Sequence, residues 1–189
     1  MKKLVLILLG VVCCVSFISS AYAAKLKRGD VVYARSNLRS KVDLISWHSM
    51  GSSPIVVPVG TEVSIKARGH GIAFVVTDTN NWYSIDTETG TKWDKFFVKD
   101  KKEIGLESLP SDKRSQIENG IITVGMTKEE VYASRGCPAY IAWGKTTERS
   151  SFADIMQSDK WYYNTNTRGQ DMMVTFQNGV VIKIGGFEV

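Results

Sequence analysis

Between residues 29 and 99 the sequence consists of short apolar segments separated by turn residues, and this pattern limits how that half of the chain can fold. The segment 62–67 alternates with a period of two, which places Val63, Ile65 and Ala67 on one face of a strand. Glycine and asparagine separate such segments, and both residues tolerate the positive φ that tight turns require. Short strands divided in this way are typical of a small all-β barrel. We expect strands at 31–33, 55–57, 62–67, 72–77, 82–85 and 93–98.

From residue 111 onward the pattern instead predicts helices followed by strands. Thr127 and Glu130 have the spacing of a capping box, in which each side chain accepts a hydrogen bond from the other residue's N–H. Gly136 and Pro138 end that helix, and Asn178-Gly179 is a strong hairpin signal. We expect helices at 111–119 and 127–136, a loop at 148–160, and strands at 139–143, 161–164, 172–177 and 180–184. This α-α-β-β-β order indicates an α+β domain.

The segment that joins the two halves is charged, weakly periodic and ends at Pro110, so we interpret it as a linker. Residues 24–102 include 13 basic and 8 acidic residues, whereas residues 103–189 include 9 and 11. This change in charge balance supports two separate modules. The predicted organisation is a two-domain chain, with a leader at 1–23, a β-barrel domain at 24–99, a linker at 100–110 and an α+β domain at 111–189.

The first 23 residues have the pattern of a secretory signal peptide. Two lysines precede a mostly apolar run at 4–18, and Ala21-Tyr22-Ala23 matches the sequence that signal peptidase cleaves. The apolar run is shorter than the ~20 residues of a membrane-spanning helix. We therefore expect cleavage after Ala23, with an uncleaved anchor as one alternative and lipidation at Cys13 or Cys14 as another. Lipidation is disfavoured because neither cysteine follows a small residue of the kind that such signals carry.

Export predicts a periplasmic or secreted protein that has no integral membrane segment after cleavage. The mature chain then keeps one cysteine, Cys137, and forms no internal disulfide. Its net charge is only mildly basic, which gives no support for nucleic-acid binding.

Three short motifs of the first module resemble those of bacterial SH3-like domains. They are Asn37-Leu38-Arg39-Ser40, Pro58-x-Gly60-Thr61-x-Val63 and Trp82-Tyr83-x-Ile85. The resemblance covers about 70 residues and implies an SH3-like barrel. Two features depart from the family pattern: Trp93-Asp94-Lys95-Phe96-Phe97-Val98 replaces the usual Gly-Trp-Val ending, and residues 45–53 form an insertion.

The second module resembles the BamE-like (SmpA/OmlA) superfamily. The matching residues are Ile117, Gly120 and Ile122, the run Gly125-Met126-Thr127-Lys128-Glu129-Glu130-Val131, Gly136-Cys137-Pro138, Trp161-Tyr162-Tyr163, and Val174-Thr175-Phe176-Gln177-Asn178-Gly179-Val180. The resemblance implies a protein-binding α+β domain. Members of the superfamily include an outer-membrane lipoprotein accessory to β-barrel assembly and an inhibitor of β-lactamases that uses an aromatic concave sheet. This chain differs in lacking the lipidated N-terminal cysteine and in carrying an extra β module, and both differences weaken the expectation of a role in outer-membrane assembly.

Aromatic residues supply the candidate binding residues. Because strand side chains alternate, Trp161 and Tyr163 share one sheet face and Tyr162 points to the other. One face must pack on the helices. We expect Trp161, Tyr163, Tyr140 and Trp143 to form an exposed aromatic patch, the alternative being that they are core residues. Aromatic and arginine side chains dominate the binding energy of many interfaces.

In the first module a second group of side chains is a candidate groove for an anionic polymer or peptide. The binding residues we assign there are Arg39 and Trp93. Trp82, Phe96, Arg35 and Lys95 complete the group. The alternative is that these side chains belong to the core or to the solvated surface.

No arrangement of residues indicates catalysis, a metal site or a cofactor. Cys137 with His48 or His70 could act as nucleophile and base, but Cys137 occupies the variable position of a Gly-x-Pro helix end, where a small residue suffices. Neither histidine has the spacing of a metal-ligand pair. Asp154 and Asp159 are the nearest carboxylate pair, and they lie in an expected loop where solvation is the default.

The sequence therefore predicts an exported, non-catalytic binding or adaptor protein of the bacterial cell envelope. Its second module would bind an envelope protein through the sheet, and its basic first module would bind an anionic component such as peptidoglycan. The alternative is a secreted inhibitor or effector that acts through the aromatic sheet face. A cell-wall enzyme is the third hypothesis.

Overall fold

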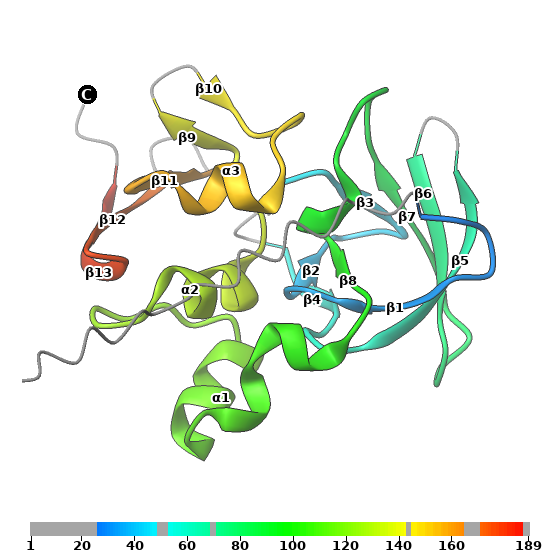
Figure 1. Ribbon diagram of the computed structural model, residues 1–189, viewed down its shortest axis with the longest axis horizontal. Helices are drawn as coiled ribbons and strands as arrows, with labels where there is room; N and C mark the ends of the chain where they lie inside the picture. Colours follow the sequence, from blue (N-terminus) through cyan, green and yellow to red (C-terminus); the bar gives the residue numbers. More distant parts are fainter. Residues whose placement is uncertain (1–25, 49–52, 69–70, 143–144, 165–170, 187–189) are drawn as a thin grey trace, which may run out of the picture.

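The computed structural model describes residues 26–48, 53–68, 71–142, 145–164 and 171–186 (Figure 1). The predicted signal peptide at 1–23 lies outside the described residues, as do His70 and the predicted binding residue Trp143. We call residues 26–98 the first lobe and residues 111–186 the second lobe.

The first lobe consists of strands and one 3-10 turn. Its strands are β1 (Val31–Ala34), β2 (Leu38–Arg39), β3 (Leu44–Ser46), β4 (Ile55–Val57), β5 (Glu62–Arg68), β6 (Gly71–Val76), β7 (Trp82–Asp86) and β8 (Phe97–Val98), with a 3-10 helix at Trp93–Lys95. Two further 3-10 helices, Lys101–Ile104 and Leu106–Ser108, lie between the lobes in the sequence.

The second lobe contains helices and a five-stranded sheet in its described part. Its elements are α1 (Ser111–Glu118), α2 (Lys128–Arg135), β9 (Tyr140–Ala142), β10 (Lys145–Thr146), α3 (Phe152–Met156), β11 (Lys160–Tyr163), β12 (Met172–Gln177) and β13 (Val180–Gly186).

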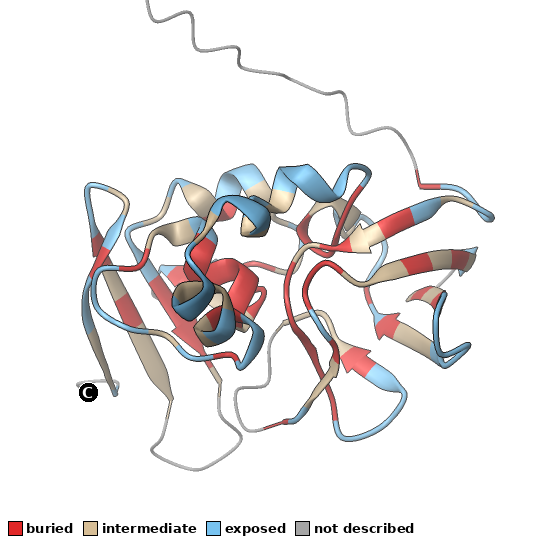
Figure 2. Cartoon of the chain, turned by 90° about the horizontal axis from the view of Figure 1, so that it is seen from below, coloured by how far each residue is buried: buried red, intermediate tan, exposed pale blue. Residues whose placement is uncertain are grey.

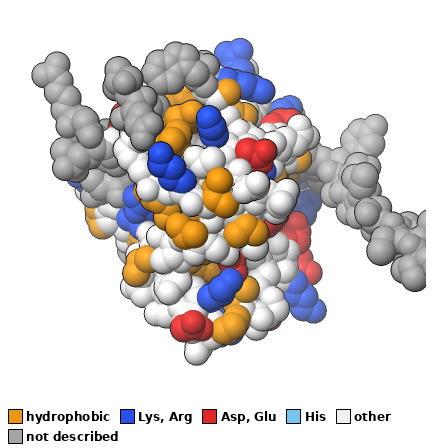
Figure 3. Space-filling view, turned by 90° about the vertical axis from the view of Figure 1, so that its left-hand side faces the viewer, with side chains coloured by type: hydrophobic (Ala, Val, Ile, Leu, Met, Phe, Trp, Pro, Cys, Tyr) orange, Lys and Arg blue, Asp and Glu red, His pale blue; other side chains and the backbone are white. Residues whose placement is uncertain are grey.

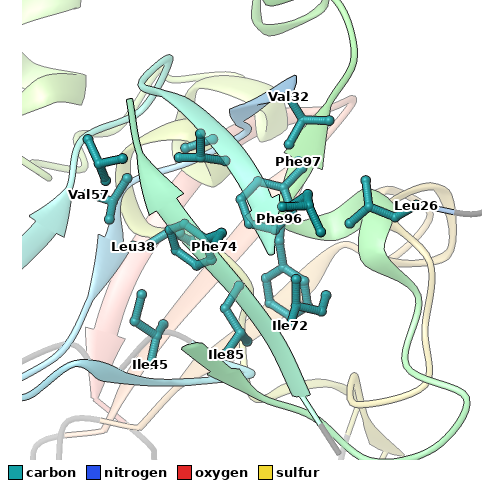
Figure 4. Close-up of a cluster of buried hydrophobic side chains, with 14 residues drawn as sticks. Leu26, Val32, Leu38, Ile45, Val57, Ile72, Phe74, Ile85, Phe96 and Phe97 are labelled. Atoms are coloured by element: carbon teal, nitrogen blue, oxygen red, sulfur yellow. The ribbon is translucent and has the colours of Figure 1, made fainter. Parts of the chain in front are cut away.

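The strands of the first lobe curl around one hydrophobic core. In the described part of the chain, six strands form a sheet in the order β3-β7-β6-β5-β1-β8, and β2 pairs with β4 beside it. All neighbours in the large sheet are antiparallel except β3 and β7. Phe74 and Phe97 lie edge to face at the centre, 5.3 Å between ring centroids (Figure 4). Alternate strand residues such as Val63 and Ile65 are fully buried there, as the period-two pattern predicts.

In the second lobe the helices cover one face of an antiparallel sheet. The strand order is β10-β9-β11-β12-β13, and buried residues lie between the helices and this sheet while exposed residues cover the outer sides of the helices (Figure 2). Tyr132 of α2 meets Trp161 of β11 edge to face, with ring centroids 6.0 Å apart. The described part of the chain contains no helix long and apolar enough to cross a membrane.

A β-rich chain with few helices is confirmed, and the structure corrects two local predictions. Residues 93–98 are not one strand: a 3-10 helix at Trp93–Lys95 precedes the two-residue β8. This turn directs Lys95 into a fully buried position, so a tertiary contact overrides the local strand pattern.

The predicted loop at 148–160 instead contains α3. Ser151 and Asp154 form a capping box in which the Ser151 hydroxyl accepts from Asp154 N–H and the Asp154 carboxylate accepts from Ser151 N–H. Aspartate replaces the more usual Glu or Gln at the third helical position. The start of α3 therefore lacks the usual capping-box pattern in the sequence.

Candidate functional site

Trp161 and Tyr163 are core residues, which corrects their assignment to an exposed patch. Both side chains are fully buried. Trp161 Nε1 donates to Ile155 O at 3.1 Å, and the Tyr163 hydroxyl donates to Gly136 O at 3.1 Å. Strand alternation was predicted correctly, but the face that carries these two residues is the one that packs on the helices.

The outer face of the same sheet carries Tyr162 and Tyr140. The two tyrosines are directly opposite each other on β11 and β9, and Met173 of β12 is opposite Tyr162 on its other side. Tyr140 is half-buried, and Tyr162 is only 8 % exposed. Little of this aromatic surface is therefore open to a partner.

A more exposed apolar surface lies on the outer face of the first sheet. Val31, Ser64, Val75 and Trp82 are consecutive neighbours across β1, β5, β6 and β7. Leu44 of β3 is opposite Ser84, two residues from Trp82 along β7, so Leu44 and Trp82 share this face. Trp82 is 58 % exposed, Val31 52 % and Leu44 51 %. Val75, between them, is only 5 % exposed. We call Val31, Leu44 and Trp82 the Trp82 stripe.

The second lobe also has a group of exposed apolar side chains. The loop before α2 runs beside β13, because Gly125 N–H donates to Val181 O and Val181 N–H donates to Met126 O. Exposed side chains flank this contact: Ile121, Val124, Val180 and Ile182. On the side of the molecule that Figure 3 shows, hydrophobic side chains gather with lysine and arginine side chains among them.

Asn37 of the first lobe joins both helices of the second. Its Nδ2 donates to Ile117 O at 2.7 Å and to Ser134 O at 3.0 Å, and its backbone N–H donates to Ala133 O at 2.9 Å. Its Oδ1 accepts from Val59 N–H at 2.9 Å. Asn37 therefore supplies several of the hydrogen bonds between the two lobes.

Lys95 makes a second buried connection between the lobes. Its Nζ donates to Thr147 O at 3.0 Å and to Glu148 O at 2.6 Å, and its own carbonyl accepts from the Tyr132 hydroxyl at 2.8 Å. Burial lowers the pKa of Lys95, and the nearby Cys137, Glu148 and Asp94 offset part of that shift. This side chain was a candidate for an open groove, but it is fully buried between the lobes.

Arg35 and Asp94 of the first lobe make further contacts with Phe152 of the second lobe. The Arg35 guanidinium lies 3.9 Å from the centre of the Phe152 ring and its Nε donates to Asp94 O at 2.6 Å. Asp94 Oδ2 accepts from Phe152 N–H at 3.1 Å. Trp93 is half-buried and packs against the core of the first lobe.

A pocket of about 240 Å³, which includes its open mouth, lies where the lobes meet. The residues that line it are Ser36, Asn37, Leu38, Arg39, Ile45, Ser46, Trp47, His48, Phe96, Gly136 and Cys137. Arg39 therefore faces the junction of the lobes, and Trp93 is not among the residues that surround it there. This pocket does not bring Arg39 and Trp93 together, as the predicted groove requires.

The structure brings Cys137 and His48 to this same pocket, although they are far apart in the sequence. Burial raises the pKa of Cys137, so the thiol form persists at neutral pH. Its Sγ lies 3.3 Å from Thr147 Oγ1 and donates to Pro138 O at 3.4 Å. Burial and the charge of Lys95 lower the pKa of His48, whose Nδ1 lies 3.2 Å from Ser46 Oγ.

The carboxylates considered for catalysis have structural contacts. Asp154 caps α3, and hydrogen bonds from Ser151 lower its pKa. Asp159 accepts from Lys128 Nζ at 2.8 Å. Over the described ranges, no group of three or more His, Cys, Asp or Glu side chains is arranged to hold a metal ion.

Neither the Trp82 stripe as a surface nor the junction as a site was predicted from the sequence. The stripe had a usable signal, since Trp82 and Ser84 point to the opposite face from half-buried Tyr83 and buried Ile85. The junction had none, because its side-chain hydrogen bonds join residues that lie between 37 and 97 positions apart. Comparison of the chain with protein families, with characterised proteins and with solved structures finds no match.

Proposed function

We propose that this chain is an exported, non-catalytic binding protein of the bacterial cell envelope, and that its protein partner docks on the Trp82 stripe. The observation that carries the proposal is an exposed tryptophan that shares one sheet face with the exposed side chains of Leu44 and Val31. Large exposed apolar side chains gathered on one face often mark an interaction site. Tryptophan is the side chain most enriched among residues that dominate binding energy.

We further infer that the first lobe is SH3-like and the second BamE-like. A curled antiparallel sheet around one core and the short motifs at Asn37, Gly60 and Trp82 support the first assignment. Two helices that precede an antiparallel sheet, the Thr127 capping box and the Asn178-Gly179 turn support the second. The helix α3 and the parallel pairing of β3 with β7 are additions to the order expected from the sequence.

Photocrosslinking in the producing cell tests the protein-binding function. A photoreactive amino acid replaces Trp82 in one variant and Glu118, which is exposed on α1, in the control. We expect a discrete crosslinked protein from position 82 and none from position 118. The Leu44→Ala substitution, added to the first variant, should reduce the yield, since Leu44 belongs to the same stripe.

Two results would overturn the docking surface: no adduct at position 82, or identical adducts at both positions in folded protein. Cell fractionation accompanies the experiment, and adaptor function predicts recovery with the envelope. An adduct recovered only from the medium would instead favour the secreted inhibitor.

Co-sedimentation of the mature chain with purified peptidoglycan sacculi tests the wall ligand separately. Positive charge is concentrated in the first half of the chain, where residues 24–102 include 13 basic and 8 acidic residues. Salt screens such contacts, so we expect pelleting at low salt that decreases at high salt. Failure to pellet at low salt would remove peptidoglycan from the proposal and leave the protein partner.

A further inference from the structure

Lysine side chains lie in a row across the outer face of the second lobe's sheet, the face that the helices do not cover. Lys160 of β11 is opposite Thr175 of β12, and Thr175 is opposite Lys183 of β13. Trp161 next to Lys160 is buried toward the helices, so Lys160 points to the outer face. Both lysines are exposed.

Lys145 completes the row. It is exposed on β10, opposite Ala142 of β9. Tyr140 of β9 is opposite Tyr162 of the antiparallel β11, so Ala142, two residues further along, is opposite Lys160. Neighbouring strands are about 4.8 Å apart, which places successive lysines, two strands apart, at a spacing of about 10 Å. We call Lys145, Lys160 and Lys183 the lysine row.

The strands that carry the lysine row contribute no negative charge. None of the residues of β9, β10, β11, β12 and β13 as described is Asp or Glu. Asp159, the acid that precedes Lys160, is paired with Lys128 at 2.8 Å. Asp154, an acid that the charge of Lys145 reaches, is already held by hydrogen bonds at the start of α3.

The helices on the other side of the sheet have the opposite charge (Figure 2). The exposed charged residues of α1 and α2 are Asp112, Glu118 and Glu129. Lys113 is paired with Glu130 at 2.9 Å. Charge of this distribution repels an acidic partner from the helices and attracts it to the outer face of the sheet.

We propose that the lysine row binds a run of acidic residues in an extended segment of a partner protein. Alternate side chains of an extended chain lie on the same side, about 7 Å apart. Consecutive Asp or Glu residues therefore bring a carboxylate within reach of each flexible lysine. Ala142 and Thr175 lie between the lysines, and their small side chains let the segment approach the sheet. This site is on the second lobe and does not depend on the Trp82 stripe.

The confinement of the charge to one row favours an extended chain over a membrane surface. The outward residues beside the row include Tyr162 and Met173 on one side and Gln177 on the other, and none of them is charged. Basic clusters that bind anionic lipids usually contain about 4–8 lysines or arginines. The described strands of this sheet supply three, all in the row.

Fluorescence anisotropy of a labelled peptide of consecutive glutamates, titrated with the mature chain, tests the site. A glutamine peptide of the same length is the blank. We expect saturable binding to the glutamate peptide that weakens as salt rises. Lys160→Gln and Lys183→Gln should each weaken it roughly twofold to fivefold, the usual range for one exposed ion pair. Adding Lys145→Gln to both should weaken it further.

The matched control is Lys99→Gln, which removes the same charge from an exposed lysine just after β8 and should bind as the wild type does. Circular dichroism checks that each variant is folded. The proposal fails if the glutamate peptide binds no better than the glutamine peptide at low salt. It also fails if the folded triple variant binds as tightly as the wild type, or if Lys99→Gln weakens binding as much as Lys160→Gln.

A parallel titration with vesicles of phosphatidylglycerol and phosphatidylcholine in equal parts separates a protein segment from a membrane. We expect little binding to these vesicles, with no difference between the triple variant and the wild type. Vesicle binding that is tighter than peptide binding and is lost in the triple variant would assign the lysine row to a membrane surface and overturn the proposal.

Discussion

At the scale of single residues, buried polar side chains at the junction carry specific bonds that a hydrophobic contact would not provide. Asn37 satisfies two helix carbonyls and one loop N–H with a single amide group. A buried backbone group that loses its partner keeps the full cost of its desolvation. The stability of this protein should therefore depend strongly on a few side chains between the lobes.

Asn37→Ala should reduce the free energy of unfolding by about 3 kcal/mol, since it leaves several buried backbone groups unpaired at roughly 1–3 kcal/mol each. Urea unfolding followed by circular dichroism measures the change. The matched control is Asn119→Ala, because Asn119 is exposed although its Nδ2 donates to Ser115 O at 2.7 Å. Its effect should stay within about 0.5 kcal/mol, and equal effects of the two variants would contradict the role assigned to Asn37.

His48 should make stability depend on pH between about 7.5 and 5.5, the range around the ordinary histidine pKa. Burial and Lys95 lower the pKa of His48 below 6.5 in the folded protein, so the unfolded chain takes up its proton at a higher pH. The unfolded state then binds more protons as the pH falls, and the free energy of unfolding decreases. The decrease should be smaller in His48→Gln, measured by urea unfolding at both ends of this range. An identical pH dependence in the variant would show that His48 does not contribute.

At the scale of elements, capping boxes mark the starts of α2 and α3. The Thr127 hydroxyl accepts from Glu130 N–H at 3.2 Å, and the Glu130 carboxylate accepts from Thr127 N–H at 2.9 Å, as the sequence predicts. Lys113 of α1 donates to the same carboxylate at 2.9 Å. The cap therefore connects α2 to α1 as well as closing its first turn.

Thr127→Ala should cost about 1 kcal/mol of stability, the usual effect of losing a threonine N-cap. Thr123→Ala is the control, because Thr123 is exposed in the loop just before α2 and its effect should be within about 0.5 kcal/mol. Chemical denaturation of both variants measures the difference. Indistinguishable midpoints would mean that packing alone determines where α2 begins.

At the scale of the whole molecule, the contacts between the lobes predict a single cooperative unfolding transition. The Tyr132 hydroxyl donates across the junction to Lys95 O, whereas the Tyr163 hydroxyl donates within the second lobe to Gly136 O. Both bonds are buried, and loss of either should cost about 1–2 kcal/mol.

Tyr132→Phe and Tyr163→Phe should each lower the midpoint of one common transition, seen together by calorimetry, tryptophan fluorescence and circular dichroism. If the lobes unfolded independently, two transitions would be seen. Tyr163→Phe would then lower the midpoint of the second lobe's transition only, and Tyr132→Phe would change neither midpoint. Two separate transitions in the unmodified protein would contradict the prediction directly.

The sequence by itself determined the local structure where a short-range pattern is strong. Period-two alternation predicted β5 and β6, and the capping box predicted the start of α2. Asn178-Gly179 predicted the hairpin of β12 and β13, and both of these turn residues have positive φ. Each of these signals lies within a few neighbouring residues. Backbone geometry alone therefore relates the sequence pattern to the local structure.

Only the tertiary structure decided which face of each sheet is covered and which polar side chains become buried between the lobes. Alternation along β11 separates Trp161 and Tyr163 from Tyr162, but it does not say which side the helices cover. Arg39, Lys95 and Asn37 have polar side chains that local patterns assign to the surface, yet the second lobe buries them. The physical reason is that their partners are backbone carbonyls and a glycine far along the chain, and such contacts exist only after both lobes have folded against each other.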